Sequence, residues 1–439
     1  MKNVLILHGI NYYNAGDHGI VLAMLKALRK KFSDVSITVA SPFRRNNQIE
    51  EVYVAKVRAN DEIAYPDEVS DLYQLPVGKK ARLVVIAYGL KAVAFCMSLT
   101  VLPFALRKRF ARTTDLGSAV LDADVVLSKG GGFLLDRGTT YSVPIHLITI
   151  WIAIILRKKT VIYAQSIGPF ESGFGRMVAG FVLRRVSLVL ARDEYSYEYS
   201  TEVLGIDPSK VKLTADAAFA LATYQGGATA ASAKQAEGCA SESPARACIT
   251  LVSPRFAGLA GEEAESQYCR VIAKVAEQIS EQGLDVMFIP HLESGKFSDR
   301  ILANRIVGFC SPEAATKMRI LEPTSPIDII NLMTESAIAI CSRMHSMIFS
   351  IDARLPFVAL SYLPKSDSML HEADLDDWRV SLPEIATGDV EAAVADVTGK
   401  FEAILADLPQ SRAKVAAAQE LLAKRSDSNL THLSNLIGS

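Results

Sequence analysis

The sequence predicts a two-domain α/β protein built on parallel sheets. Short apolar runs that are typical of buried strands alternate with longer amphipathic runs that are typical of helices. The 439 residues exceed what one hydrophobic core usually holds. A stretch rich in Ala, Gly and Ser at 223–247 has no apolar periodicity and is typical of a linker between domains.

Composition and charge exclude several classes of protein. The net charge is −1, so nothing in the whole chain favours nucleic acid, and an anionic substrate would need a local site. The six cysteines include no C-x-x-C pair, and we find no secretory signal. We therefore expect a reducing, cytoplasmic setting and no metal.

The first strand–loop–helix unit opens the chain. Residues Asn3 to Leu7 are expected to form a strand and Ile20 to Phe32 a helix. The loop between them includes Asn14 and Asp17, and it lacks the G-x-G-x-x-G spacing of a dinucleotide site. Asp17 is either a catalytic or orienting carboxylate or the N-cap of the helix.

Polar residues follow two further strands of the first half. The strand ending at Leu127 precedes Gly130, Gly131 and Gly132, which either let the backbone approach a ligand or form a tight turn. The strand Leu188 to Ala191 precedes Arg192. Because the carboxyl ends of parallel strands share one edge of a sheet, we expect a crevice there.

The second half repeats this pattern with more reactive side chains. The strand Ile338 to Cys341 is followed by Arg343, Met344 and His345, which precede a helix whose free N–H groups favour an anion. His291 follows another strand and is either a site residue or a loop histidine. Lys365 lies just beyond a third strand end. Arg343 and His345 are the first candidates for chemistry.

A hydrophobic segment interrupts the first domain. Residues 83–106 are apolar except for Lys91, and basic residues stand on both sides of them. The segment is long enough for a bilayer helix, but Lys91, Pro103 and the symmetric charges favour a helix lying at the membrane interface. A buried helix or a dimer contact is the alternative.

These features divide the chain into four parts. We expect a first domain at 1–222, with the membrane-associating insertion at about 79–112, and the flexible linker at 223–247. A second domain is expected at 248–385. The Ala-rich C-terminal helices at 386–439 are expected to cross back toward the first domain.

The ordered motifs resemble those of the polysaccharide pyruvyl transferase family. The matching segments are NYYNAGDHGI, SKGGG, YAQSIGPF, ARDEYS, TADAAF, IPH, CSRMHS and SYLPK, in the family's order. The hydrophobic insertion departs from the family pattern. The resemblance implies two facing Rossmann-like domains similar to the glycosyltransferase-B fold, and transfer of pyruvate from phosphoenolpyruvate to a sugar as a cyclic ketal.

The resemblance also assigns roles to residues. Arg192 and Arg343 would hold the donor's phosphate and carboxylate with the backbone near Met344, and His345 matches the catalytic histidine. Asp17 is a further catalytic candidate, as an acceptor of the sugar's proton. The further candidates for substrate binding are Lys365, Asn14, His291 and Gly130 to Gly132. Guanidinium groups suit a compact trianion, and histidine suits proton transfer near neutral pH.

No metal or cofactor is implied beyond phosphoenolpyruvate as donor. The expected partners are this donor, a sugar acceptor for which a lipid-linked oligosaccharide is one candidate, and a membrane surface. The expected location is cytoplasmic, peripheral on the inner face of the cell membrane, in exopolysaccharide or cell-envelope synthesis. Two alternatives remain open: a glycosyltransferase or sugar-nucleotide enzyme of the same fold, and a non-catalytic membrane-associated scaffold.

Overall fold

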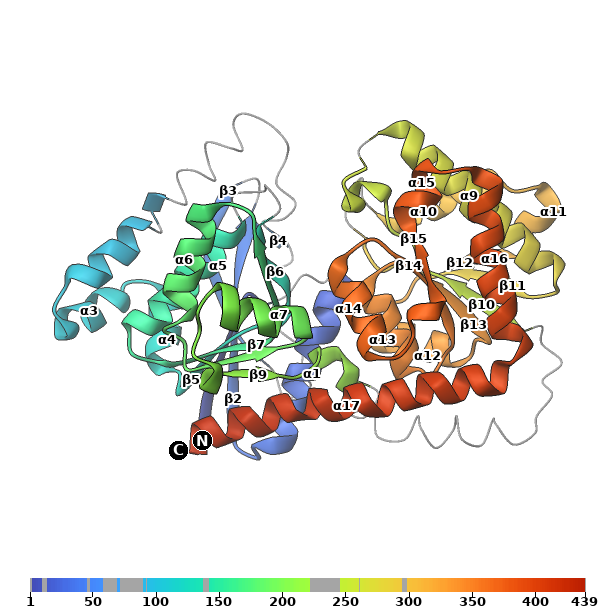
Figure 1. Cartoon of the computed structure of the whole chain (residues 1–439). Coiled ribbons are helices and arrows are strands. Elements are labelled where there is room, and N and C mark those ends of the chain that lie inside the picture. Colours follow the sequence, from blue (N-terminus) through green and yellow to red (C-terminus); the bar gives the residue numbers. More distant parts are fainter. Residues whose placement is uncertain are drawn as a thin grey trace. The chain divides into compact units, whose positions relative to one another are not determined.

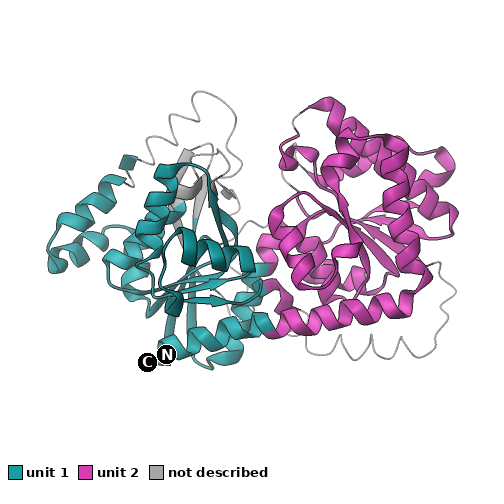
Figure 2. Cartoon of the chain, viewed as in Figure 1, with its two compact units in different colours: residues 1–11, 20–217, 425–439 teal, residues 12–19, 218–424 magenta. Residues whose placement is uncertain are grey.

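The computed structural model forms two compact units of sheet and helix (Figures 1 and 2). It describes residues 2–9, 14–45, 48–57, 69–71, 90–91, 93–136, 142–221, 245–259, 261–293 and 298–438. Unit 1 comprises residues 1–11, 20–217 and 425–439, and unit 2 comprises residues 12–19 and 218–424. Most of the predicted linker at 223–247 lies outside the described residues.

Unit 1 is built on a sheet whose longest path runs β3-β2-β1-β5-β7-β8-β9. Neighbours from β2 to β9 along this path are parallel, and the antiparallel β3 and β4 pair with β2. The strands are β1 (Lys2–Leu7), β2 (Val35–Arg45), β3 (Gln48–Lys56), β4 (Val69–Asp71), β5 (Val125–Ser128), β6 (Gly131–Asp136), β7 (Lys159–Phe170), β8 (Leu188–Ala191) and β9 (Val211–Leu213). The helices are α1 (Ala15–Lys31), α3 (Phe104–Ala111), α4 (Asp115–Asp122), α5 (Ser142–Ile155), α6 (Gly173–Leu183) and α7 (Glu194–Glu198).

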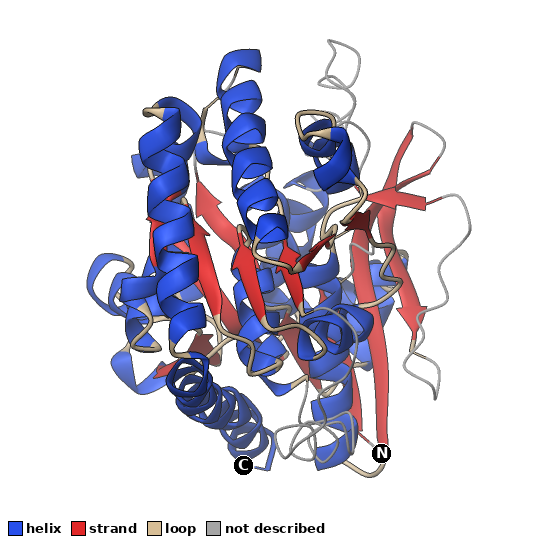
Figure 3. Cartoon of the chain, turned by 90° about the vertical axis from the view of Figure 1, so that its right-hand side faces the viewer, coloured by secondary structure: helices blue, strands red, loops and turns tan. Residues whose placement is uncertain are grey.

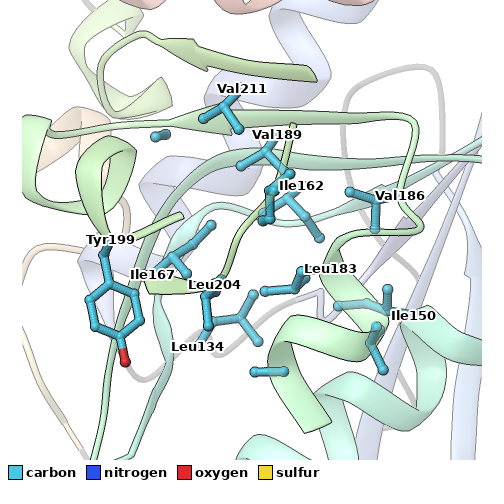
Figure 4. Packing of buried hydrophobic residues seen from close by; sticks show 14 of the residues in the cluster. Leu134, Ile150, Ile162, Ile167, Leu183, Val186, Val189, Tyr199, Leu204 and Val211 are labelled. Carbon is cyan, nitrogen blue, oxygen red and sulfur yellow. The ribbon is translucent and has the colours of Figure 1, made fainter. Parts of the chain in front are cut away.

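One core of unit 1 lies between this sheet and its helices. Ile162 and Val189 of adjacent strands meet Leu183 of α6 and Ile150 of α5 in a buried apolar cluster (Figure 4). These strands are continuous apolar runs because both faces of a parallel sheet are covered by helices. The sequence predicted β8 with the bounds that the structure has.

Unit 2 has a six-stranded sheet in the order β12-β11-β10-β13-β14-β15, with every pair parallel. The strands are β10 (Arg246–Ile249), β11 (Asp285–Phe288), β12 (Met318–Ile320), β13 (Ile338–Cys341), β14 (Phe357–Ser361) and β15 (Arg379–Ser381). The helices, some of which cover this sheet in Figure 3, are α9 (Glu262–Glu281), α10 (Asp299–Val307), α11 (Pro312–Ala315), α12 (Pro326–Thr334), α13 (Met344–Asp352), α14 (Pro364–Glu372), α15 (Leu382–Thr387), α16 (Val390–Ala406) and α17 (Leu408–Gly438). Both units therefore have the strand order of a Rossmann-like sheet.

The C-terminal region predicted to be helical at 386–439 forms α16 and α17. Helix α16 ends at Ala406, and α17 begins at Leu408 and ends at Gly438. The residues beyond Lys424 belong to unit 1, where the Asn429 Nδ2 donates to the Ala215 carbonyl at 2.8 Å. The last turns of α17 therefore pack within unit 1.

The hydrophobic segment is divided at Pro103. Residues 93–101 are helical, and α3 begins after Pro103 as a separate helix. Proline ends the first helix because it lacks the N–H that a continuous helix would need. Among the described residues, no helix is both long enough and apolar enough to cross a bilayer.

Candidate active site

The strand order of unit 2 reverses between β10 and β13, and the first candidate residues lie at that point. Ligands of open α/β sheets bind beyond the carboxyl ends of the strands where the order reverses. Thr250 and Leu251 follow β10, and Ser342 and Arg343 follow β13. The predicted arginine therefore lies at the crevice position of this sheet.

Hydrogen bonds between the two strand ends fix the loop that carries Arg343. The Ser342 Oγ donates to the Thr250 carbonyl at 2.7 Å, and the Ser342 N–H donates to the Thr250 Oγ1 at 3.1 Å. The same Thr250 hydroxyl donates to the Ser346 Oγ at 2.8 Å in the first turn of α13. A buried network of this kind restricts the backbone, so the side chains after β13 are held in place.

Arg343 is held by a carboxylate that the sequence analysis did not single out. Its Nη2 donates to the Asp299 Oδ1 at 2.6 Å and its Nε to the Asp299 Oδ2 at 3.0 Å, a paired ion bridge. The Nε also donates to the Leu251 carbonyl at 3.0 Å, and the guanidinium lies 5.3 Å from the Phe256 ring centroid. The Nη1 has no hydrogen-bond partner in the described parts of the chain, and the side chain is 12% exposed. One edge of the fork is therefore left for an anion.

Burial and Asp299 act in opposite directions on this cation. Burial alone would lower the pKa of the Arg343 guanidinium, but the charge of Asp299 and its hydrogen bonds raise it. Asp299 also accepts from the backbone N–H groups of His291 at 3.0 Å and Leu292 at 2.9 Å. The buried carboxylate of Asp299 thus connects the segment that follows β11 to the segment that follows β13.

His291 is buried behind Arg343 as a neutral imidazole. Its Nδ1 donates to the Ile289 carbonyl at 3.1 Å, and its ring stacks on Phe349 with centroids 5.8 Å apart. Burial lowers the pKa of His291 to about 4, and the nearby charge of Arg343 acts in the same direction. The predicted site residue therefore lies in the site region but is 2% exposed.

His345 lies in the first turn of α13, packed against the first motif. A Cβ built on Gly16 would come within 2.7 Å of the His345 Cβ and closer still to its Nδ1. Only glycine fits there without moving the imidazole. Figure 2 includes residues 12–19 with unit 2, and Ala15 donates its N–H to the His291 carbonyl at 2.9 Å. Residues 14–19 of the first motif and the CSRMHS segment, distant in sequence, therefore meet in one unit.

The interpretation of Asp17 as the N-cap of α1 is wrong. The Asn14 Oδ1 accepts from the Gly16 N–H at 3.0 Å and from the Asp17 N–H at 3.4 Å, so Asn14 caps the helix. Asp17 lies in the first turn, half-buried, where a carboxylate is favoured by the helix dipole. The Asn14 side chain, predicted to bind substrate, has a structural partner in the helix.

The β14 end adds Lys365. It is half-buried in the first turn of α14, after Ser361 and Tyr362. Tyr362 lies near enough to Arg343 to influence the pKa of its guanidinium. Met344, at the N-terminus of α13, is 6% exposed.

Arg192 in unit 1 is enclosed by acidic and hydroxyl groups. It forms an ion pair with Asp216, its Nε donates to the Ser166 Oγ at 2.8 Å, and Asp193 lies 3.8 Å away. The side chain is 0% exposed. In this structure the predicted phosphate-binding guanidinium therefore has no accessible surface for a donor, and its contacts are those of a buried ion pair.

The three glycines after β5 are explained in part by packing. A Cβ on Gly130 would lie 2.6 Å from the Ala164 carbonyl oxygen and 3.0 Å from that of Tyr163 in β7. Gly131 adopts a φ of 134°, which favours glycine, and begins β6 together with Gly132. The close approach of β7 thus requires Gly130 whether or not a ligand is bound.

Sequence reasoning missed a histidine pair at the strand reversal of unit 1. His8 follows β1 with its Nε2 2.6 Å from the Thr149 Oγ1 and its Nδ1 3.1 Å from the Ser128 Oγ. The ring of His146 lies 4.5 Å from that of His8. Burial, followed by the charges of His146 and Lys129, lowers the pKa of His8. The φ of 61° at His8 could not be read from the sequence. Among the described residues, no group of three or more His, Cys, Asp or Glu is arranged to hold a metal.

Comparison with known proteins identifies the family. The profile of the polysaccharide pyruvyl transferase family matches residues 14–364, which include the motif loops of both units. The chain belongs to the polysaccharide pyruvyl transferase family. It is also 22% identical over 395 residues to the amylovoran biosynthesis protein AmsJ of Erwinia amylovora, covering 89% of this chain and 91% of that protein. The resemblance predicted from the motifs is confirmed.

Two solved structures with similar folds contain UDP. MnaA of S. aureus with UDP has a TM-score of 0.58 at 12% identity, covering 100% of this chain and 98% of the other. HepE of Anabaena with UDP has a TM-score of 0.51 at 10% identity, with 100% of both chains covered. The predicted glycosyltransferase-B-like class, with two Rossmann-like domains, is confirmed.

Proposed function

We propose that this family member transfers the pyruvyl group of phosphoenolpyruvate to a sugar, forming a pyruvate ketal during exopolysaccharide or cell-envelope synthesis. The observation that carries the proposal is the arrangement after β13. A guanidinium fixed by Asp299 lies at the N-cap of α13, and His345 lies in the first turn of the same helix. A cation and an imidazole at a helix N-terminus suit a small, highly charged enol phosphate.

In this proposal Arg343 holds the donor. Its Nη1 and the first backbone N–H groups of α13 bind the carboxylate or phosphate, and Lys365 adds a second positive charge. Because Asp299 restrains the guanidinium before the donor arrives, little side-chain entropy remains to be lost on binding. Asp299 and His291 act as positioning residues through their contacts with Arg343 and the β11 end.

His345 delivers the proton that starts the reaction. The proton goes to the methylene carbon of phosphoenolpyruvate, and the adjacent carbon becomes electron-poor and is attacked by a sugar hydroxyl oxygen. The C–O bond to phosphate then breaks, and a second hydroxyl of the same sugar bonds to that carbon to close the ring. One hydroxyl proton restores the histidine, and the other leaves with the phosphate. Histidine suits both directions of transfer near neutral pH. Asp17 is the candidate to take the second hydroxyl proton first and to pass it to the departing phosphate.

We also propose that the protein is located in the cytoplasm. The five cysteines that the structure describes are free: Cys96, Cys248, Cys269, Cys310 and Cys341. Free and mostly buried thiols are typical of proteins kept in a reducing compartment. A donor made inside the cell would be available there.

The competing function is a sugar-nucleotide enzyme, which the UDP-bound structures of similar fold suggest. Purified protein is incubated with phosphoenolpyruvate or with UDP-sugars, each with and without candidate glycans, and phosphate, UDP and glycan mass are measured. Phosphate release that requires a glycan, together with a pyruvyl-sized mass gain, supports the proposal. Release of UDP without use of phosphoenolpyruvate contradicts it. The His345→Gln variant is the control, because it should bind the donor and release no phosphate.

A further inference from the structure

One side of unit 1 exposes large apolar side chains on two neighbouring segments. Leu90, Val93, Met97 and Val101 are exposed on residues 90–101, and Leu106 follows on α3. Phe174, Met177 and Phe181 are exposed on α6. Single exposed apolar residues are ordinary on a protein surface, but clusters mark contact with a partner or membrane.

Both segments pack on α5, so they belong to one side of the unit. The Cys96 Sγ lies 3.9 Å from the Ile148 carbonyl, and the Phe181 ring centroid lies 5.1 Å from that of Trp151. Beneath the first segment, Cys96 and Leu99 are buried against Ile152 and Leu156. Residues 93–101 therefore have an inner face that contributes to the core and an outer face that is apolar. Figure 1 shows this helix and α3 projecting at the edge of unit 1.

A basic cavity lies beside this apolar surface. Its volume is about 420 Å³, and Lys108, Arg109, Arg112, Arg157 and Lys158 line it with Phe104, Leu121 and Leu156. None of these lining residues is acidic. Five cations around one cavity give it the charge that suits a phosphate group.

Only some of these charges are balanced within the unit. Arg112 pairs with Asp122, and the Lys158 Nζ donates to the carbonyls of Leu121 at 2.7 Å and Ala123 at 2.8 Å. Lys108 and Arg109 have no carboxylate within ion-pair distance in the described part of the chain, and both are exposed. The ring of Phe104 lies 4.8 Å from the Lys108 Nζ and 4.4 Å from the Arg157 guanidinium, so it holds two cations near the cavity.

We propose that this side of unit 1 docks on an anionic phospholipid bilayer, with a lipid headgroup phosphate in the basic cavity. The exposed side chains of residues 90–106 and of α6 then enter the boundary between headgroups and acyl chains. Apolar residues beside a cluster of Lys and Arg are the combination that binds a charged membrane interface without crossing it. A soluble protein partner would suit the apolar side chains but would not explain the two exposed cations, Lys108 and Arg109, beside them. The proposal uses none of the residues assigned to pyruvyl transfer.

The test is flotation of the full-length protein with lipid vesicles. Vesicles of phosphatidylcholine alone are compared with vesicles that also contain phosphatidylglycerol, at low and high salt. The protein should float with the anionic vesicles, and high salt should release it because screening weakens charge attraction. The Lys108→Gln/Arg109→Gln variant should bind at least about tenfold more weakly, since each cation near an anionic surface contributes to binding.

One further variant tests the contribution of the apolar side chains, and another is a control for the loss of two positive charges. Met97→Gln/Val101→Gln, on exposed positions four residues apart, should also weaken binding, because less apolar surface leaves water. Lys317→Gln/Arg319→Gln removes two exposed cations of unit 2 and should bind as wild type. Thermal unfolding checks that each variant is folded.

Three outcomes overturn the proposal. One is equal binding to neutral and anionic vesicles, and another is wild-type binding by the Lys108→Gln/Arg109→Gln variant. The third is binding of inorganic phosphate in the cavity without any flotation, which would assign the cavity to a soluble phosphate compound. The result of the phosphoenolpyruvate assay does not affect any of these three outcomes. The membrane proposal and the proposed function can therefore fail separately.

Discussion

Gly16 lies directly against the imidazole of His345. A Cβ at residue 16 would meet the His345 Cβ at 2.7 Å and its Nδ1 at a shorter distance, nearer than real Cβ atoms come. The glycine belongs to the first motif and the histidine to a loop more than three hundred residues later. The absence of a side chain at residue 16 therefore leaves the space that the His345 imidazole occupies.

Gly16→Ala should lower kcat by about a hundredfold, because a displacement near 1 Å of a catalytic group costs about that much. The KM for phosphoenolpyruvate should change little, since the guanidinium of Arg343 is held by Asp299 and the Leu251 carbonyl. Steady-state kinetics of phosphate release measure both. Gly399→Ala is the matched control, because a Cβ on Gly399 meets nothing within 4 Å. Wild-type kcat in Gly16→Ala would mean that the position of the imidazole is unimportant.

Arg343→Lys should raise the KM for phosphoenolpyruvate on the order of tenfold, because lysine keeps the charge but cannot bind Asp299 and an anion with one planar fork. Donor affinity can be measured by calorimetry as well as by kinetics. Arg319→Lys makes the same exchange at an exposed position and should leave the affinity unchanged. An affinity for the donor within twofold of wild type would remove Arg343 from the donor site.

The strand positions could be predicted because local sequence decides them. The runs Leu188–Ala191 and Ile338–Cys341 are buried on both faces, so each reads as a continuous apolar segment. Since parallel strands end at one edge, the location of Arg343 followed from the strand that precedes it.

Partners across the fold could not be predicted in this way. Asp299 lies 44 residues before Arg343, at the start of another helix, and nothing in its neighbourhood distinguishes it from an ordinary first-turn carboxylate. His8 and His146 meet only because β1 and α5 are neighbours in the folded unit. The N-cap of α1 is Asn14, three residues before Asp17. Asn and Asp are both common at helix starts, so only the hydrogen bonds in the structure show which of them is the cap.

Unit 2 should lose stability as pH falls from about 6.5 toward 4, in part because of His291. Its folded pKa is lowered to about 4, so between these values the unfolded chain binds a proton that the native state does not. The linkage amounts to roughly 2 kcal/mol between pH 7 and pH 5. His291→Asn should reduce the pH dependence by about this amount, although it lowers stability at pH 7. Denaturant unfolding measures it through the fluorescence of Trp378, with Trp151 replaced by Phe so that only unit 2 reports.

An unchanged pH dependence in His291→Asn would show that the pKa of the imidazole is the same in the native and unfolded states. His18→Asn is the comparison, because burial also lowers the pKa of His18 to about 4. The two substitutions together should reduce the pH dependence of the stability of unit 2 more than either substitution alone.

Arg192→Met should destabilise unit 1 by about 3–5 kcal/mol, because it leaves the buried Asp216 without its cation. Arg192→Met/Asp216→Leu should recover a large part of this loss, since removing both charges avoids an unpaired one. The fluorescence of Trp151, with Trp378 replaced by Phe, reports the unfolding of unit 1. The opposite pattern, with unfolding unchanged and a raised KM for phosphoenolpyruvate in Arg192→Met, would return Arg192 to the donor-binding role that the family motif predicts. The two measurements therefore decide whether this arginine serves the fold or the substrate.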